Sequence, residues 1–444
     1  MSNILVLGAG MVSSPLVQYL LDQPNMKVTM ASRTVKKAEL IIDNHPNGEA
    51  VSLDVNNDEN LENLIKESDI VVSLLPYIFH VKVAKICISH QKHLVTTSYV
   101  SDEMQALDEA AKKADVLLLN ESGLDPGIDH MSAMRIIHQV EEKNGKITLF
   151  KSTTGALPSH EANTNPFGYK FSWSPKGVLL ASRNAAKWLQ DGEIVSIPGK
   201  QLFENYYLKD VPDIGTFENY PNRDSVQYKQ IYGLKDAETV YRGTFRMIGW
   251  CETLKAIAEL GWLKDTLPDD FNGTTYADVT KYLIKAKSTE NLMQETATYL
   301  GLKPYSSVIK RLQWLGLFSS IPLPGGKNNP LDYLNVLSLE KMSLAADERD
   351  MIVMHHEFNA VYDDKEEYIT STLLQYGIRH GDSAVARTVA LPAAIAVKMI
   401  LQNKITLTGV HRPTIPAIYN PILDELETMD IIFKEQAIPT AFKQ

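Results

Sequence analysis

NILVLGAGMVSS, at residues 3–14, contains an apolar strand, a glycine-rich turn and the start of a helix. The branched residues before the turn are typical of a strand buried on both faces of a parallel sheet. Gly8 permits a tight turn, and Gly10 allows a pyrophosphate to approach the N-terminus of the helix that follows. Ser13 stands where the dinucleotide fingerprint has its third glycine. The position between a strand and a helix still favours nucleotide binding over an ordinary turn.

The second strand pattern, at residues 26–31, ends in Ser32, Arg33 and Thr34. An acidic residue at this point would accept hydrogen bonds from the ribose 2′-hydroxyl of NAD, whereas an arginine suits the 2′-phosphate of NADP. This segment offers a guanidinium and two hydroxyls without a carboxylate. We therefore predict NADP as the cofactor, against the alternative that Arg33 is only a solvated charge at a helix start.

Strand and helix patterns alternate with short connections up to about residue 120, which predicts an α/β fold with a Rossmann-type, doubly wound parallel sheet. Ligands of such sheets bind outside the carboxyl ends of the strands. The residues at these ends are therefore the candidate ligand contacts: Asp54 beside the adenine, and Leu75, Pro76, Thr97, Ser98, Tyr99 and the loop at 121–129 near the nicotinamide.

The loop ESGLDPGIDHM, at residues 121–131, places two aspartates before a helix. Asp125 or Asp129 is suited to cap that helix, because aspartate before an apolar helical run is a common cap. Asp125 also follows a strand directly at the expected ligand edge, where it would face the substrate. Spacing alone favours neither role.

Beyond residue 146 the pattern changes to a mixed, mostly antiparallel sheet, in which residues 226–232 are expected to be a strand. Arg242, in a strand beside Gly243, is a candidate for carboxylate recognition. Helical patterns fill residues 251–341. We expect three domains with these boundaries: a dinucleotide-binding domain at 1–128 completed by about 385–444, a mixed substrate and dimerisation domain at 129–258 and 348–384, and a helical subdomain at 259–347.

Composition excludes several classes of protein. The net charge of -10 argues against nucleic acid as a partner, since binders of polyanions usually carry a basic face. Cys87 and Cys251 are far apart and lack neighbours at ligand spacing, so neither a disulfide framework nor a metal site is expected. The first strand begins within three residues, and no uncharged apolar span of membrane length appears. A cytoplasmic protein without membrane association is expected.

Separated motifs in this chain together resemble one family. These motifs, in chain order, are LGAGMV at 7–12, SRT at 32–34, SLLPY at 73–77, TTSY at 96–99, GLDPGIDHM at 123–131, NPFGYKFSWSPKGVLLA at 165–181, YRGTFR at 241–246 and TGVHRP at 408–413. Over essentially its full length the chain resembles saccharopine dehydrogenase of the glutamate-forming type. The resemblance implies a nicotinamide-dependent enzyme that interconverts saccharopine with L-glutamate and 2-aminoadipate 6-semialdehyde in lysine metabolism, and Arg33 predicts that the cofactor is NADP. A homodimer is also expected, with the hairpin predicted at residues 351–376 as its candidate contact.

The resemblance also implies site residues. Asp125 and Tyr99 are the expected acid–base groups. Substrate contacts are expected at Ser98, Tyr99, Asp125, Ser174, Arg242, Leu263, Lys264 and Asp265. Cofactor contacts are expected at Gly8, Gly10, Met11, Val12, Ser32, Arg33, Thr34, Asp54, Leu75, Thr97, Ser98, Leu124, Asp125 and Pro126.

One position departs from the family pattern: Thr154 stands where relatives often have a cysteine. Two rival functions remain open. One is a dehydrogenase of the carboxynorspermidine type, which would need acidic residues rather than Arg242 around a diamine. The other is a non-catalytic NADP-binding sensor. The physiological direction of the reaction is not determined by the sequence.

Overall fold

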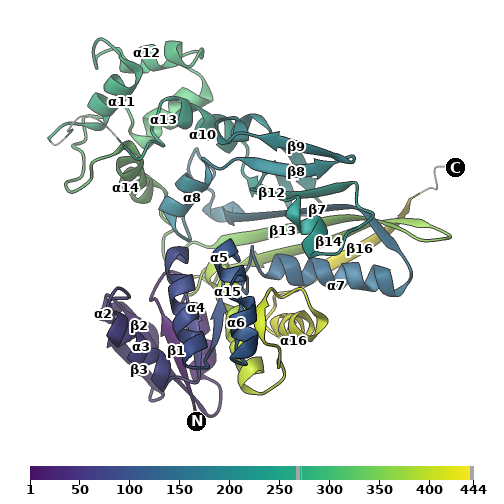
Figure 1. Ribbon diagram of the computed structural model, residues 1–444. Helices are drawn as coiled ribbons and strands as arrows, with labels where there is room; N and C mark the ends of the chain where they lie inside the picture. Colours follow the sequence, from purple (N-terminus) through teal and green to yellow (C-terminus); the bar gives the residue numbers. More distant parts are fainter. Residues whose placement is uncertain (267–270, 272, 441–444) are drawn as a thin grey trace. The chain divides into compact units, whose positions relative to one another are not determined.

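The computed structural model describes residues 1–266, 271 and 273–440 of the chain (Figure 1). Two compact units emerge from the contacts within the chain, and each is described by itself. Unit 1 comprises residues 1–146, 360–366 and 371–444, and unit 2 comprises residues 147–359 and 367–370.

Unit 1 is built on a seven-stranded sheet with the order β3-β2-β1-β4-β5-β6-β15. All of its strand pairs are parallel. The strands are β1 (Ser2–Leu7), β2 (Met26–Ser32), β3 (Gly48–Ser52), β4 (Ile70–Ser73), β5 (His93–Thr96), β6 (Leu117–Leu119) and β15 (Gly409–His411). This arrangement confirms the predicted doubly wound parallel sheet.

Helices connect these strands and cover the sheet of unit 1. They are α1 (Ser14–Leu21), α2 (Val35–Ile42), α3 (Asp58–Glu67), η1 (Tyr77–Phe79), α4 (His80–Ser89), α5 (Asp102–Gln105), α6 (Asp108–Lys113), α7 (Ile128–Glu142), α15 (Ala384–Leu401) and α16 (Pro416–Glu427). Leu5, Val71 and Leu94 lie in one core with side chains of α3 and α4. Burial of these apolar side chains from both faces explains why the strands read as continuous apolar runs.

The helix α15 is long and apolar enough, by length and composition, to cross a membrane. It packs against α1 and α16, however, and most of its apolar window is buried inside the protein. Pro392 lies within this helix rather than at its start. The apolar composition of α15 is therefore explained by its position in the core.

The strand order of unit 1 reverses between β1 and β4, which are hydrogen-bonded neighbours. The connections that follow the two strands at such a point run in opposite directions, so their loops separate and leave a crevice at the carboxyl edge of the sheet. Gly8 and Leu74 are the first residues beyond β1 and β4 at this edge. The glycine-rich turn thus begins at the place where open α/β sheets bind their ligands.

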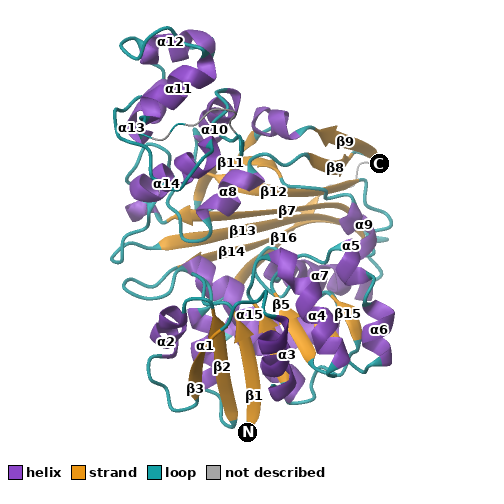
Figure 2. Cartoon of the chain, turned by 60° about the vertical axis from the view of Figure 1, so that its left-hand side comes forward, coloured by secondary structure: helices purple, strands orange, loops and turns teal. Residues whose placement is uncertain are grey.

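Unit 2 contains a mixed sheet with the order β10-β11-β12-β7-β13, and β8 pairs with β12 and β9 (Figure 2). Pairs β10/β11, β11/β12, β12/β8 and β8/β9 are antiparallel, and β12/β7 is parallel. The strands are β7 (Lys146–Pro158), β8 (Ala186–Gln190), β9 (Glu193–Ile197), β10 (Tyr207–Val211), β11 (Gly215–Pro221), β12 (Thr239–Arg246) and β13 (Asp350–Val361). Two later strands are β14 (Glu366–Tyr376), whose residues divide between the units, and β16 (Phe433–Thr440) in unit 1.

Helices α10 to α14 group at one end of the sheet of unit 2 (Figure 1). The helical segments of this unit are η2 (His160–Ala162), α8 (Pro175–Ala181), η3 (Gly199–Glu204), α9 (Gln227–Ile231), α10 (Trp250–Glu259), α11 (Tyr276–Ile284), α12 (Leu292–Tyr299), α13 (Ser307–Leu315) and α14 (Pro330–Met342). Trp250 and Trp262 lie fully buried in the core that joins these helices to the aromatic residues Tyr169 and Phe171.

The predicted strand at 226–232 is wrong, because this segment forms the helix α9. The carboxylate of Asp224 accepts a hydrogen bond from the backbone N–H of Val226 at 2.9 Å. Tyr228 and Tyr232, four residues apart, share one buried face of the turn. Gly233 follows at φ +69°, the left-handed conformation that ends many helices. Alternation of apolar residues over so short a segment did not distinguish a helix from a strand.

Candidate active site

The turn after β1 requires glycine at one position and tolerates a side chain at the other. Gly8 has φ +108°, and a Cβ there would lie 3.1 Å from the carbonyl oxygen of Leu74. A Cβ at Gly10 would have nothing within 4 Å. Gly8 is therefore needed for the turn itself, whereas the space beside Gly10 is open for a ligand. Such an open backbone cradle at a helix start fits a pyrophosphate.

The residues after β2 fit an adenosine 2′-phosphate. Arg33 is exposed, and within the described part of the chain its guanidinium makes no ion pair. The hydroxyl of Ser32 accepts a hydrogen bond from the backbone N–H of Thr34 at 3.3 Å, which curves the chain around this point. Asp54, beyond β3, accepts from the backbone N–H of Asn56 at 3.0 Å. Arg33 thus presents an unpaired cation beside two hydroxyls, as NADP requires.

The other predicted cofactor contacts of unit 1 also lie at the carboxyl edge of its sheet. Met11 and Val12 follow the turn, and the Met11 side chain is 59% exposed, which is unusual for an apolar residue. Leu75 and Thr97 lie just beyond β4 and β5 and are partly exposed. Ser98 and Asp125 are also partly exposed, whereas Leu124 and Pro126, the two neighbours of Asp125, are buried.

Tyr99 and Asp125 form a hydrogen-bonded pair just beyond β5. The Tyr99 hydroxyl donates to Asp125 Oδ1 at 2.9 Å, and both side chains are partly exposed. The two predicted acid–base residues are thus brought together by segments 26 residues apart. A carboxylate that accepts from a phenol at a ligand edge is suited to proton transfer.

Asp129 contacts the start of α7, whose N-cap residue is Gly127. Asp129 Oδ1 accepts a hydrogen bond from the backbone N–H of Gly127, the residue before the helix, at 2.6 Å. The loop is closed further by the N–H of Gly123, which donates to the carbonyl of Pro126 at 3.0 Å. The two aspartates that the sequence left ambiguous therefore have different surroundings, and Asp125 is the one beside Tyr99.

The carboxylate of Glu121 is buried beneath this loop. Its Oε1 accepts from the backbone N–H of Val100 at 2.9 Å and from Arg412 Nε at 2.9 Å. Its Oε2 lies 2.7 Å from Nε2 of His130. Burial would raise the pKa of Glu121, but the hydrogen bond from His130 and the charges of His130 and Arg412 lower the pKa to about 2. The side chain is therefore an anion at neutral pH that holds the residue after Tyr99 in place.

In unit 2, Arg242 lies buried on β12 with its guanidinium 4.4 Å from the centre of the Tyr228 ring. Its backbone N–H donates to Ser225 Oγ at 3.0 Å. The segment that was predicted to be a strand, α9, thus supplies an aromatic platform beneath this arginine. Such stacking restricts the guanidinium to one plane, which suits recognition of a carboxylate.

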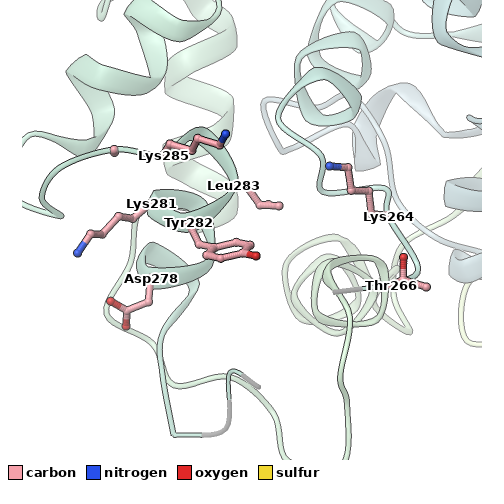
Figure 3. A pocket seen from close by; sticks show the side chains of 8 residues that line it. Lys264, Thr266, Asp278, Lys281, Tyr282, Leu283 and Lys285 are labelled. Carbon is pink, nitrogen blue, oxygen red and sulfur yellow. The ribbon is translucent and has the colours of Figure 1, made fainter. Parts of the chain in front are cut away.

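The remaining predicted substrate contacts of unit 2 have varied surroundings. Ser174 is exposed and accepts from the backbone N–H of Gly177 as the cap of α8. Leu263 is buried in the core, and Asp265 pairs with Arg183 at 2.9 Å. Lys264 lines an open pocket of about 920 Å³ together with residues of α11, and Figure 3 shows its ammonium directed toward that helix. Of these four side chains, Leu263 is the least accessible to a ligand.

Arg246, four residues beyond Arg242 on β12, is expected from its spacing to share a sheet face with Arg242, and its side chain is buried. Its guanidinium lies 5.1 Å from the centre of the Tyr169 ring and 5.5 Å from that of Trp250. Arg246 Nε has no hydrogen-bond partner among the described residues. The same is true of Oγ1 of Thr154, on the neighbouring strand β7. The same guanidinium donates through Nη1 to the carbonyl of Phe245 at 2.8 Å. Buried polar atoms without partners are costly, so Arg246 Nε and Thr154 Oγ1 are candidates for contact with a ligand acceptor.

The described residues contain no group of three or more histidine, cysteine or carboxylate side chains arranged to hold a metal ion. Cys87 and Cys251 are both free and buried, and burial raises the pKa of each thiol. Raised thiol pKa values make these cysteines poor nucleophiles and poor metal ligands.

Comparison with known proteins identifies the family. A model described as the saccharopine dehydrogenase NADP binding domain matches residues 4–119, and one described as the saccharopine dehydrogenase C-terminal domain matches residues 123–432. The chain belongs to the saccharopine dehydrogenase family. The resemblance carried by its motifs is thereby confirmed.

Individual saccharopine dehydrogenases cover the whole chain. The NADP(+), L-glutamate-forming saccharopine dehydrogenase of Schizosaccharomyces pombe is 39% identical, over 99% of this chain and 99% of its own length. That of Saccharomyces cerevisiae is 38% identical, over 98% and 99%. The mitochondrial alpha-aminoadipic semialdehyde synthase of Mus musculus is 34% identical over 98% of this chain but only 48% of its own length.

A solved structure of the family has the same fold. The apo, histidine-tagged saccharopine dehydrogenase (L-Glu forming) from Saccharomyces cerevisiae superposes with a TM-score of 0.91 at 37% identity. The superposition covers 99% of this chain and 100% of the other. The parallel sheet of unit 1 and the mixed sheet of unit 2 are therefore the architecture of a saccharopine dehydrogenase.

The two glycines of the turn should respond differently to alanine. Gly8→Ala introduces a Cβ at positive φ and should lower the free energy of unfolding by about 1 to 3 kcal/mol. Gly10→Ala should leave the melting temperature unchanged but weaken NADPH binding about tenfold or more, a loss of about 1.4 kcal/mol. Calorimetry measures the stability of each variant, and a fluorescence titration with NADPH measures its affinity for the cofactor. Unchanged NADPH affinity in Gly10→Ala would contradict the assigned pyrophosphate site.

Glu121→Gln should destabilise the protein by about 3 kcal/mol at pH 7, because it leaves His130 and Arg412 beside an uncharged partner. The folded pKa of Glu121 lies below its unfolded value of about 4.3, so its stabilisation is complete above that value and fades as the pH falls toward 2. In urea unfolding, the difference in the free energy of unfolding between wild type and variant should therefore become smaller from pH 7 to pH 3. A difference in free energy that is constant with pH would show that the charge of Glu121 does not contribute to stability.

Proposed function

We propose that this protein is an NADP-dependent saccharopine dehydrogenase of the L-glutamate-forming type. The observation that carries the proposal is the Tyr99–Asp125 pair at the carboxyl edge of β5, on a sheet whose first turn has the open backbone of a dinucleotide site. The names of the full-length relatives support the same activity. They favour neither a diamine substrate nor a sensor without catalysis.

The proposed reaction oxidises the C–N bond of the secondary amine. Saccharopine, water and NADP⁺ give L-glutamate, 2-aminoadipate 6-semialdehyde, NADPH and a proton, and the same groups serve the reverse reaction. The nicotinamide, when bound, supplies the two-electron acceptor. The chain supplies binding, orientation and proton transfer, and orientation of two reactants accounts for much of the rate in such reactions.

Within unit 1, we assign proton transfer to Asp125, with Tyr99 donating to it. The substrate amine must lose a proton before oxidation, and water must be activated for addition to the imine; a carboxylate fixed by a phenol suits both steps. Such general acid–base assistance is typically worth about 10²- to 10⁴-fold in rate. Ser98, the neighbour of Tyr99, is proposed to bind a substrate carboxylate.

Within unit 2, Arg242 and Arg246 are proposed to bind carboxylates of the substrate. Arg242 is held flat by Tyr228, and Arg246 has a buried Nε without a partner in the described chain. Thr154, whose hydroxyl is also buried without a partner, is proposed to donate a hydrogen bond beside Arg246. Ser174 and the segment 263–265 remain proposed contacts, with Lys264 the most accessible member of that segment.

Cofactor preference is proposed to depend on Arg33, since a guanidinium pairs with the 2′-phosphate of NADP. Purified protein should oxidise saccharopine faster with NADP than with NAD. Arg33→Asp should lower kcat/KM for NADP about 10- to 100-fold, the loss expected for a charge-assisted hydrogen bond, with little change for NAD. Lys66→Asp on α3, which makes the same change of charge, is the matched control and should keep the preference. Absence of turnover with either cofactor, while NADPH still binds, would refute the saccharopine assignment.

We also propose a homodimer in the cytoplasm. Tyr207 and Leu208, on the edge strand β10, are 40% and 56% exposed, and Ile194 on β9 is 57% exposed. Apolar side chains on strand edges are a common basis of association. The hairpin at 351–376, which the sequence suggested as the contact, is a weaker candidate because β13 is almost wholly buried.

Light scattering coupled to size-exclusion chromatography should give a mass twice that of the chain. The variant Leu208→Lys should shift the measured mass toward that of the monomer. Ile432→Lys, which alters an exposed apolar residue before β16, is the control and should leave the mass unchanged. A monomeric wild type at micromolar concentration would refute the dimer.

A further inference from the structure

The buried side chain of His80 joins three hydroxyl groups at the carboxyl ends of β4 and β5. Its Nδ1 lies 2.9 Å from Ser73 Oγ. Its Nε2 lies 2.8 Å from Ser98 Oγ and 3.2 Å from Thr96 Oγ1. His80, Ser73 and Thr96 are buried, whereas Ser98 is partly exposed. Ser98 is therefore the member of this hydroxyl cluster that can contact a ligand.

The imidazole of His80 is neutral at physiological pH, because burial lowers its pKa to about 4. A neutral imidazole has one N–H donor and one acceptor nitrogen. Which nitrogen carries the proton therefore decides the direction of every hydrogen bond in the cluster. The favoured tautomer is the one that leaves fewer buried donors and acceptors unsatisfied.

A proton on Nδ1 satisfies the cluster poorly. Ser73 would accept that proton, and its own buried hydroxyl proton would have no acceptor among the described residues. The single lone pair of Nε2 would then face two hydroxyls. If Ser98 donates to this lone pair, the Thr96 hydroxyl has no acceptor among the described residues. If Thr96 donates to it, no proton lies between Nε2 and Ser98 Oγ, although these atoms are 2.8 Å apart. Unsatisfied buried hydroxyls cost the full desolvation of the group.

A proton on Nε2 leaves fewer groups unsatisfied. Ser73 then donates to Nδ1, and Nε2 donates along its shorter contact to Ser98, so that among the described residues only the Thr96 hydroxyl lacks an acceptor. We infer that His80 is an Nε2–H imidazole that donates to Ser98 and so turns the Ser98 hydroxyl proton outward, toward an oxygen acceptor of the substrate. His80 is thus a positioning residue that makes Ser98 a donor.

This orientation defines what Ser98 selects. A serine that accepts from His80 keeps its own proton free, and a carboxylate, which has no proton to donate, requires such a donor. The inference rests on the proposed function for the identity of the substrate and deepens it: His80 keeps Ser98 available as a donor to a carboxylate of saccharopine.

Two substitutions of His80 separate the roles of its nitrogens. The amide nitrogen of glutamine reaches the position of Nε2, and that of asparagine reaches only the position of Nδ1. His80→Gln should keep KM for saccharopine within about threefold. His80→Asn should raise it about tenfold, as should Ser98→Ala, the loss expected for a hydrogen bond to a charged group. Neither of the two His80 variants should change kcat or the Kd for NADPH more than about twofold.

The double variant His80→Asn/Ser98→Ala should be no worse than Ser98→Ala alone, because both changes remove one interaction. His90→Gln, at the other end of the same helix, is the control and should leave KM unchanged. Equal increases of KM in His80→Gln and His80→Asn would overturn the inference, as would additive effects in the double variant.

A measurement without turnover tests the same inference. Long-range ¹H–¹⁵N spectra of protein labelled at histidine, assigned with His80→Gln, should show a protonated Nε2 and an unprotonated Nδ1 that do not titrate above pH 5. Ser98→Ala should shift the Nε2 resonance. A protonated Nδ1 would overturn the assignment, even if the variants fold poorly. Failure of wild type to oxidise saccharopine would instead refute the proposed function, and the spectra would still decide the tautomer.

Discussion

The buried negative charge of Glu121 is the constraint on which the ligand edge of unit 1 depends. Glu121 adopts φ +57°, a conformation that few residues other than glycine adopt readily. Its carboxylate joins three separate segments, through Val100, His130 and Arg412. Charge-assisted hydrogen bonds to a buried carboxylate are strong enough to offset a backbone cost of this kind. The strained residue and its partners therefore hold one another in place.

Backbone hydrogen bonds complete the same edge. The N–H groups of Glu121 and Ser122 donate to the carbonyls of Ser98 and Thr96 at 3.1 Å each, so the loop after β6 is fastened to the end of β5. Main-chain groups thus fix the position of the loop together with the side chain of Glu121. A site that rests on its scaffold in this way keeps its reacting groups in a defined geometry without ligand.

The features predicted well from the sequence are those that depend on near neighbours in the chain. Strands buried on both faces appear as apolar runs, and Gly8 and Arg33 follow their strands directly. The choice between Asp125 and Asp129 was not predictable, because both lie within the reach of the same helix start and only Tyr99 distinguishes them. The segment of α9 was misjudged for a similar reason, since its two tyrosines face a core that the local pattern does not describe.

Other features required the three-dimensional structure altogether. Glu121 and Arg412 are 291 positions apart, and nothing near either residue indicates its partner. Composition gave two weaker signals. His80 is a polar residue on the buried face of α4, where an apolar one is expected, and Glu121 is a carboxylate two residues beyond the apolar strand β6. Buried polar residues of this kind point to a network even when the network itself is hidden.

The pairing of β15 with β6 has a consequence for synthesis of the chain. At ribosomal rates of about 5 to 20 residues per second, β6 waits on the order of 15 to 60 s for its neighbour, because all of unit 2 is translated between them. During that time β6 lacks its outer partner strand, and Glu121 lacks the cation of Arg412. Unit 2 is contiguous except for four residues, so it is able to fold while this edge is still incomplete. The nascent chain therefore exposes an unprotected strand for tens of seconds, a period in which chaperone binding would be most useful.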